Sequence, residues 1–160
     1  MRANVDVRLA GPADLDALVR LAGAFRDQLG RTTPLDADFR ASIAALLEDP
    51  GTEFFLAGSG PATCGYVQCR YRYSAWSSAP EAELEDVFVM PAARRYGIAT
   101  RLVEFAIARA GNKGCRLIGL NTNERNTGAL ALYQRLGFGA ERELWNGGRQ
   151  LWLEKRLDTH

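Results

Sequence analysis

The sequence predicts an α/β fold (an α+β mixed sheet), in which one sheet carries helices on both of its faces. Two observations lead to this prediction. Short segments with alternating or continuous apolar residues, typical of strands, are interleaved with longer segments whose apolar residues recur every three or four positions. The order of these segments is β-α-α-β-β-β-α-β-α-β-β, with about seven strands. Interleaved strands and helices pack as layers around a shared core.

The elements can be delimited by their apolar patterns and turn residues. Val5, Val7 and Leu9 alternate with polar residues in the first strand, which Gly11 and Pro12 end, and proline suits the first turn of a helix. In order, we predict a strand over 4–9, helices over 15–30 and 36–48, strands over 53–57, 64–73 and 84–90, a helix over 98–110, a strand over 115–121, a helix over 127–136, and strands over 141–145 and 150–157.

Three later elements carry specific signals. The helix over 98–110 has one apolar stripe, formed by Ile98, Leu102, Val103, Ala106 and Ala110. Asn126 can cap the next helix, and Gly137 can end it in a left-handed conformation. The first long helix is expected to carry Leu29 on its apolar side. Asn146-Gly147-Gly148 is a hairpin signal between the last two strands.

Composition restricts the class of protein. With 160 residues, one domain over 1–160 is expected. The 20 basic and 19 acidic residues nearly cancel, so no net field favours nucleic acid or an anionic membrane as a partner. No apolar run reaches the roughly 20 residues that span a bilayer, and the N-terminus lacks the apolar core of a signal peptide. A cytoplasmic protein is expected.

Histidine and metal chemistry are not predicted. The single histidine is His160, the last residue. Cys64, Cys69 and Cys115 match no zinc or redox spacing, and we interpret them as small apolar residues in a reducing compartment. We therefore expect no metal and no nucleophilic cysteine.

The strongest local signal is the segment 84–100, LEDVFVMPAARRYGIAT. A strand-like run meets Pro91 and a basic turn, which opens into a helix at Ile98. Backbone N–H groups at a helix start have no intrahelical partner and carry partial positive charge, so such a turn favours an anion, phosphate above all. The spacing Arg94-x-x-Gly97-x-Ala99 matches neither a Walker loop nor a dinucleotide fingerprint.

Three segments, in order, resemble the GCN5-related N-acetyltransferase (GNAT) family. The segment 84–100 is similar to the family's acetyl-CoA signature, R/Q-x-x-G-x-G/A, with Ala99 in the last place. LIGLNTNERN over 117–126 resembles the next strand and the asparagine at its exit. ALALYQRLGF over 129–138 resembles the closing helix with its tyrosine. The string LEDVFVM resembles the diamine acetyltransferase branch. A GNAT-like fold and acetyl-CoA as co-substrate are implied.

The resemblance also implies where the cofactor binds. Backbone amides from about Arg95 to Thr100 would hold the coenzyme A pyrophosphate, with Arg94 beside it. The strand over 87–90 would diverge from the strand over 118–120 and bind pantetheine, and the N–H of Val89 would polarise the thioester carbonyl. Asn126 would bind the cofactor arm. The implied cofactor-binding residues are Phe88, Val89, Arg94, Arg95, Tyr96, Gly97, Ile98, Ala99, Thr100, Asn121, Asn126 and Tyr133.

Two side chains join Val89 as candidate catalytic residues. Tyr133 stands where the family commonly has a tyrosine facing the thioester sulfur, and its phenol would protonate the departing thiolate. On the residues alone, an aromatic on an apolar helix stripe is interpreted as a core residue, and the resemblance favours the acid role. Glu85 is the candidate base that deprotonates the acceptor amine, directly or through a water.

The residues before the motif suggest how an amine could be recognised. Glu81, Glu83 and Glu85 alternate, would share one face of a strand and could attract a cationic amine, although Glu81 and Glu83 are equally interpreted as surface residues. Asp86 is expected on the opposite face. The predicted substrate-binding residues are Glu83, Glu85, Trp76 and Thr33; Trp76 and Thr33 are also compatible with plain loops.

The implied function is transfer of the acetyl group of acetyl-CoA to a primary amine by direct attack, with a small cationic amine favoured. Two alternatives remain, a non-catalytic acyl-CoA-binding regulator and a protein or peptide N-acetyltransferase. A homodimer is possible if Trp145 or Trp152 is exposed.

Overall fold

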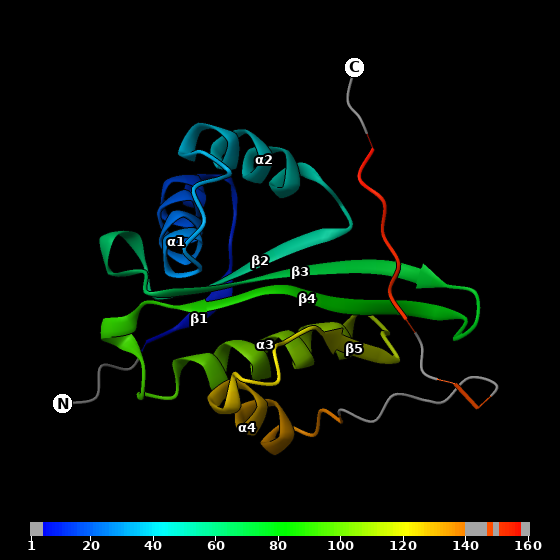
Figure 1. The fold of residues 1–160 in the computed structure, drawn as a ribbon. Helices are drawn as coiled ribbons and strands as arrows, with labels where there is room; N and C mark the ends of the chain where they lie inside the picture. The colour runs from blue at the N-terminus through cyan, green and yellow to red at the C-terminus, as the bar shows by residue number, and fades with distance from the viewer. Residues whose placement is uncertain (1–4, 140–146, 149–150, 158–160) are drawn as a thin grey trace. The chain divides into compact units, whose positions relative to one another are not determined.

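The structure is a computed structural model that describes residues 5–139, 147–148 and 151–157 (Figure 1). The chain divides into two compact units, Met1–Arg125 and Asn126–His160, and each is considered by itself. No helix in the described ranges is long and apolar enough to cross a membrane.

The first unit is built on a mixed five-stranded sheet with the order β1-β2-β3-β4-β5. The strands are β1 (Val7–Leu9), β2 (Thr52–Ala57), β3 (Gly65–Ser74), β4 (Ala79–Val89) and β5 (Leu117–Leu120). β1 to β4 pair antiparallel, and β5 joins β4 in parallel. The helices of this unit are α1 (Leu15–Gln28), α2 (Asp36–Glu48) and α3 (Ile98–Asn112), with 3₁₀ turns at Pro12–Asp14, Gly60–Ala62 and Pro91–Ala93.

Helices cover both faces of this sheet, as predicted. Figure 1 shows α1 and α2 on one side and α3 on the other. On the α1 side, a buried cluster joins Leu18 and Leu21 of α1 to Tyr66 and Phe88 of the sheet. On the α3 side, the predicted stripe is confirmed, because the five residues named from the sequence are the five that α3 buries. The sheet therefore separates two apolar layers.

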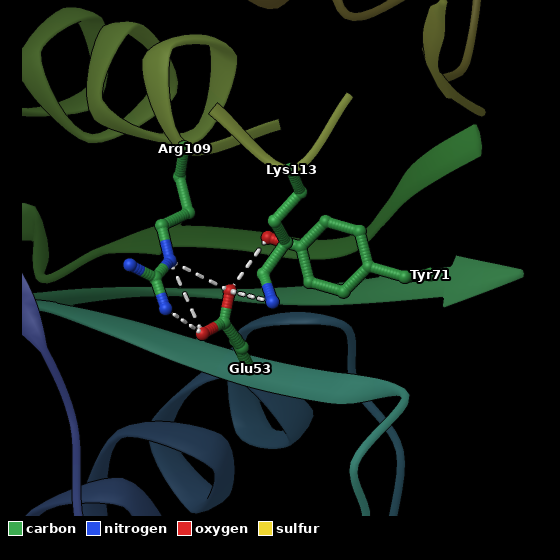
Figure 2. Close-up of polar contacts among 4 residues, drawn as sticks. All are labelled: Glu53, Tyr71, Arg109 and Lys113. Carbon is green, nitrogen blue, oxygen red and sulfur yellow. Dashed lines mark hydrogen bonds and ion pairs between the residues drawn. The ribbon is translucent and has the colours of Figure 1, made fainter. Parts of the chain in front are cut away.

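Figure 2 shows how the last turns of α3 are fixed to the sheet by Glu53 of β2. Arg109 donates from Nε and Nη2 to the two carboxylate oxygens at 3.0 and 2.6 Å, and the Tyr71 hydroxyl donates at 2.7 Å. Lys113 Nζ lies 3.8 Å from Glu53 Oε1 and 4.9 Å from the centre of the Tyr71 ring. Burial raises the pKa of Glu53, but these donors outweigh it, and the net pKa lies below the usual value. Glu53 is a fixed anion.

β4 contains a bulge. In the register with β3, Cys69 lies opposite Leu84 and Gln68 lies opposite Asp86, so Glu85 is an extra residue of β4. Such an extra residue shifts the alternation of side chains and commonly ends strand pairing.

The described part of the second unit centres on α4 (Thr127–Arg135). Asn126 Oδ1 accepts a hydrogen bond from the Ala129 N–H at 3.2 Å, which confirms the predicted cap. Gly137 has φ of +92°, which confirms the left-handed end. Tyr133 is buried, and its ring centre lies 5.6 Å from that of Phe138.

Three predictions about the elements need correction. β4 begins at Ala79, well before the predicted start at residue 84, because it pairs with β3 along almost its whole length. Leu29 is 54% exposed, because α1 ends before it. The strand predicted over 141–145 lies outside the described residues, and residues 151–157 form no strand. The described ranges therefore hold five strands, where the sequence predicted about seven.

Candidate active site

The candidate site lies along the edge of β4 that β5 leaves open. β5 pairs with β4 only from Glu81 to Leu84, whereas β4 continues to Val89. Within the described ranges, no other strand lies beside residues 85–89 on that side. The divergence implied by the family resemblance is present, and it begins at the bulge.

The backbone N–H of Val89 points to this open edge. The next amide, that of Met90, donates to the Cys64 carbonyl on the β3 side at 2.7 Å. Backbone groups of successive residues in an extended chain point to opposite edges, so the N–H and carbonyl of Val89 point away from β3. This orientation suits a donor to a thioester carbonyl oxygen.

The start of α3 supplies further amides. Gly97 precedes the helix with φ of +76°, a conformation that favours glycine, and Arg95 has φ of +71°. Arg101 N–H donates to the Gly97 carbonyl at 3.1 Å, so the N–H groups of Ile98, Ala99 and Thr100 lie ahead of the first α-helical bond. These amides and the positive end of the helix dipole fit a phosphate group.

The Arg94 side chain connects the open edge to α1. Its Nε donates to the Val89 carbonyl at 3.0 Å, and its guanidinium also bonds the Gln28 side chain. The guanidinium carbon lies 5.9 Å from the centre of the Phe88 ring. Arg94 therefore satisfies the Val89 carbonyl and leaves the N–H of that residue to face the edge.

Glu85 is held by two side chains of β3. Gln68 Nε2 donates to Glu85 Oε2 at 2.8 Å, and Arg70 Nε lies 3.3 Å from Glu85 Oε1. Glu83 lies opposite Arg70 in the register, so Glu83 and Glu85 share a face, as predicted. The Glu85 carboxylate is therefore already paired with the Arg70 guanidinium.

Asp86 faces the same side as Glu85, and the expectation that it faces the opposite side is wrong. The Tyr66 hydroxyl donates to Asp86 Oδ2 at 2.8 Å, and Tyr66 shares a face of β3 with Gln68, the partner of Glu85. The reason is the bulge, which shifts the alternation of β4 by one residue. Burial raises the pKa of Asp86, and the hydrogen bond from Tyr66 lowers it by less.

The other predicted site residues of the first unit fall in different places. Phe88 is not brought to the open edge, because it pairs with Tyr66 of β3 and its ring lies in the core, 5.1 Å from that of Phe25. Trp76 is fully exposed in the turn before β4. The remaining three are exposed, Thr33 between α1 and α2, Tyr96 before α3 and Asn121 after β5.

Asn126 and Tyr133 belong to the second unit, and their roles toward the cofactor stay predictions. Burial raises the pKa of Tyr133, which keeps its phenol protonated at neutral pH and able to donate a proton. In the part of the chain that the structure describes, no group of three or more His, Cys, Asp or Glu side chains could hold a metal ion.

Sequence reasoning missed the β3 residues that contact the bulge. Arg70 and Arg72 alternate before the turn as Glu81 and Glu83 do after it, and pairing the two segments as a hairpin would have revealed the match. The link between Tyr66 and Asp86 had no such signal, because it depends on the bulge.

The chain is similar to known acetyltransferases in sequence and in fold. The model of the acetyltransferase (GNAT) family matches residues 17–138. An aminoglycoside N(6')-acetyltransferase type 1 from Salmonella typhimurium is 33% identical over 117 residues, which cover 71% of this chain and 79% of that protein. A thialysine N-epsilon-acetyltransferase from Mus musculus is 32% identical over 99 residues, 62% of this chain and 55% of that protein.

A solved structure agrees over nearly the whole chain. The aminoglycoside N-acetyltransferase AAC(6')-Iy, in complex with CoA, matches with a TM-score of 0.77 and 27% identity over 96% of both chains. The family match spans the open edge of β4, the start of α3 and α4. This chain therefore belongs to the acetyltransferase (GNAT) family and is an acetyl-CoA-dependent N-acetyltransferase.

Proposed function

We propose that this enzyme moves the acetyl group of acetyl-CoA to a primary amine of a small cationic molecule by direct attack. The open edge of β4 is the main support for this proposal. It begins at the bulge, where Glu85 and Asp86 lie, and leads to the amides at the start of α3. The Val89 N–H points to this edge. The relatives named for aminoglycoside and thialysine acceptors support a small molecule that carries amino groups.

The donor would lie along the open edge. Amides from Arg95 to Thr100 would bind the pyrophosphate, and the edge of β4 would bind pantetheine as an added strand does. The thioester carbonyl would then accept a hydrogen bond from the Val89 N–H, which stabilises the charge that develops on its oxygen. Asn126 would bind the cofactor arm.

The acceptor would approach from the face that carries Glu83 and the bulge. A carboxylate of the bulge, with Glu85 the candidate from the sequence, takes a proton from the ammonium group. The amine nitrogen then forms a bond to the acetyl carbon, and the carbon–sulfur bond breaks. Tyr133 gives its proton to the thiolate and regains one, through water, from the nitrogen as it becomes the amide. Trp76 and Thr33 are candidate contacts for the rest of the acceptor.

A thiol-release assay tests the proposal. Purified protein is mixed with acetyl-CoA and a panel that holds thialysine, spermidine, an aminoglycoside such as kanamycin, and short peptides. Release of free CoA with the small amines supports the proposal. Release with peptides alone would favour a peptide N-acetyltransferase. Acetyl-CoA binding without release from any amine would favour a non-catalytic regulator and overturn the proposal.

The role of Tyr133 has its own test. Tyr133→Phe should lower kcat about 10- to 100-fold while the KM for acetyl-CoA stays within about twofold, because the phenol acts after the donor has bound. Tyr73→Phe is the matched control, since Tyr73 is 71% exposed on β3. A Tyr133→Phe enzyme at the wild-type rate would assign this tyrosine to packing.

A homodimer stays a prediction. Trp152 is 85% exposed, and Trp145 lies outside the described residues. Sedimentation velocity on the full chain decides between monomer and dimer.

A further inference from the structure

β4 carries two neighbouring carboxyls whose surroundings differ. Glu85 is engaged by Gln68 at 2.8 Å and by Arg70 at 3.3 Å. Asp86 receives a hydrogen bond from the Tyr66 hydroxyl at 2.8 Å. Within residues 5–139, 147–148 and 151–157, no arginine or lysine forms an ion pair with Asp86. The bulge places both carboxyls on the face that bears Glu83.

We propose that Asp86 takes the proton from the acceptor amine, while Glu85, held by Arg70 and Gln68, binds the ammonium group as a counter-ion. Tyr66 is then a positioning residue that acts through Asp86. The proposal rests on the proposed function and names which carboxylate of the bulge is the base.

The contacts of Glu85 suit a counter-ion. Its two carboxylate oxygens are already engaged, one by Arg70 and the other by Gln68. A general base, by contrast, loses its charge in the step that it catalyses.

The contacts of Asp86 suit the base. Burial without a cation raises its pKa toward the range in which a general base works. The Tyr66 hydroxyl holds one carboxylate oxygen and leaves the other to accept a proton. Two carboxyls in environments that differ in this way commonly divide the electrostatic and proton-transfer roles.

The groups around Asp86 come from three elements. On β3, Tyr66 is its hydrogen-bond donor, and Arg70 is engaged with Glu85. On β4, Glu85 and Glu83 are the titratable neighbours. From α1, Leu18 and Leu21 pack in the cluster that holds Tyr66. Burial and the hydrogen bond from Tyr66 are the causes of the shifted pKa of Asp86.

The proposed step balances. The ammonium gives its proton to Asp86 Oδ1, the nitrogen lone pair forms the bond to the acetyl carbon, and the electrons of the carbon–sulfur bond leave with the thiolate. Tyr133 protonates the thiolate, and the second proton that the nitrogen loses as it becomes the amide passes through water to restore the Tyr133 phenol. Asp86 then returns its proton to water before the next turnover.

Asp86→Asn and Glu85→Gln separate the two roles with thialysine or kanamycin as the acceptor, whichever the wild type acetylates. For Asp86→Asn we expect kcat/KM to fall about 100-fold at neutral pH. It should then rise about tenfold per pH unit toward the pKa of the amine, because only acceptor that is already neutral can react. Wild type should be flat over that range. Glu85→Gln should raise the acceptor KM about tenfold and change kcat by less than about threefold.

Tyr66→Phe keeps both carboxyls and tests the same assignment if Asp86→Asn folds poorly. The lost hydrogen bond removes a contact that lowers the pKa of Asp86, so the acid limb of kcat/KM should move to higher pH. Tyr71→Phe is the matched control. It removes a tyrosine–carboxylate bond of 2.7 Å on the opposite face and should leave the profile unmoved.

The outcomes distinguish the two proposals. If wild type releases no thiol with any amine, the proposed function is wrong. The proposal for Asp86 is then wrong as well, because it rests on that function. If wild type is active but Asp86→Asn stays within about threefold of it at every pH, the assignment of the base is overturned. A pH-dependent loss in Glu85→Gln in place of Asp86→Asn would make Glu85 the base.

Discussion

Two tyrosine–carboxylate pairs of β3 lie on opposite faces of the same sheet. Tyr71 donates to Glu53 at 2.7 Å, and Tyr66 donates to Asp86 at 2.8 Å. Arg109 and Lys113 also form ion pairs with Glu53 (Figure 2). In the described ranges, no arginine or lysine forms an ion pair with Asp86. Burial raises the pKa of both carboxyls, but the donors reverse the outcome for Glu53 alone.

The neighbouring cations, not the tyrosine, therefore decide whether the pKa of a half-buried carboxyl lies above or below its usual value. A carboxylate surrounded by donors stabilises the fold and titrates only in acid. A carboxylate with a single neutral donor is costly to ionise and so remains responsive to pH. Substitutions at the two carboxyls and their partners should therefore differ in effect.

Arg109→Ala should have the largest effect on stability. It removes charged hydrogen bonds at 2.6 and 3.0 Å and leaves the Glu53 carboxylate, only 12% exposed, without its main donor. We expect the free energy of unfolding to fall by about 2 kcal/mol, measured by urea denaturation. Arg72→Ala, at an exposed position of β3, is the control. Equal midpoints for the two variants would show that the Glu53 cluster contributes nothing.

Tyr71→Phe should cost less, about 1.5 kcal/mol, because one hydrogen bond to a charged group is lost and Arg109 still pairs with Glu53. Urea denaturation measures the loss. If this variant also moved the pH profile of catalysis, the Glu53 cluster on one face of the sheet would be coupled to Asp86 on the other face.

Asp86→Asn should act on stability with the opposite sign. The folded pKa of Asp86 lies above its unfolded value, so ionisation costs stability at neutral pH, and the cost disappears as pH falls through the folded pKa toward the unfolded one. We expect a gain of about 1 kcal/mol at neutral pH that vanishes in acid, a typical exchange of activity for stability. Unfolding at a series of pH values measures it, and a loss at neutral pH would contradict the expectation.

Glu53→Gln supplies the reverse pH dependence. The folded pKa of Glu53 lies below its unfolded value, so its contribution is present above the unfolded pKa and is lost as pH falls through the folded one. The variant should therefore be less stable than wild type at neutral pH and approach it in acid. Parallel curves at every pH would mean that the charge of Glu53 is irrelevant.

Lys113→Met should have the smallest effect, below about 0.5 kcal/mol, because its ammonium is 3.8 Å from Glu53 and 35% exposed. The difference should shrink further in high salt. A salt-independent loss would point to packing on the Tyr71 ring instead of charge.

The elements that could be predicted from sequence are those governed by local periodicity and local chemistry. All five residues of the α3 stripe, the Asn126 cap and the left-handed Gly97 and Gly137 follow from neighbours within a few positions. The start of β4 and the exposure of Leu29 did not, because they depend on a partner strand and on where a helix ends.

The amide-lined turn before α3, the alternating glutamates and their place in a GNAT motif can be recognised in the sequence alone. That an extra residue at Glu85 turns Asp86 to the face of Tyr66, and that β5 leaves β4 at the same point, is visible only in the folded chain. A bulge and the end of a pairing are properties of two strands together. Neither strand specifies them alone.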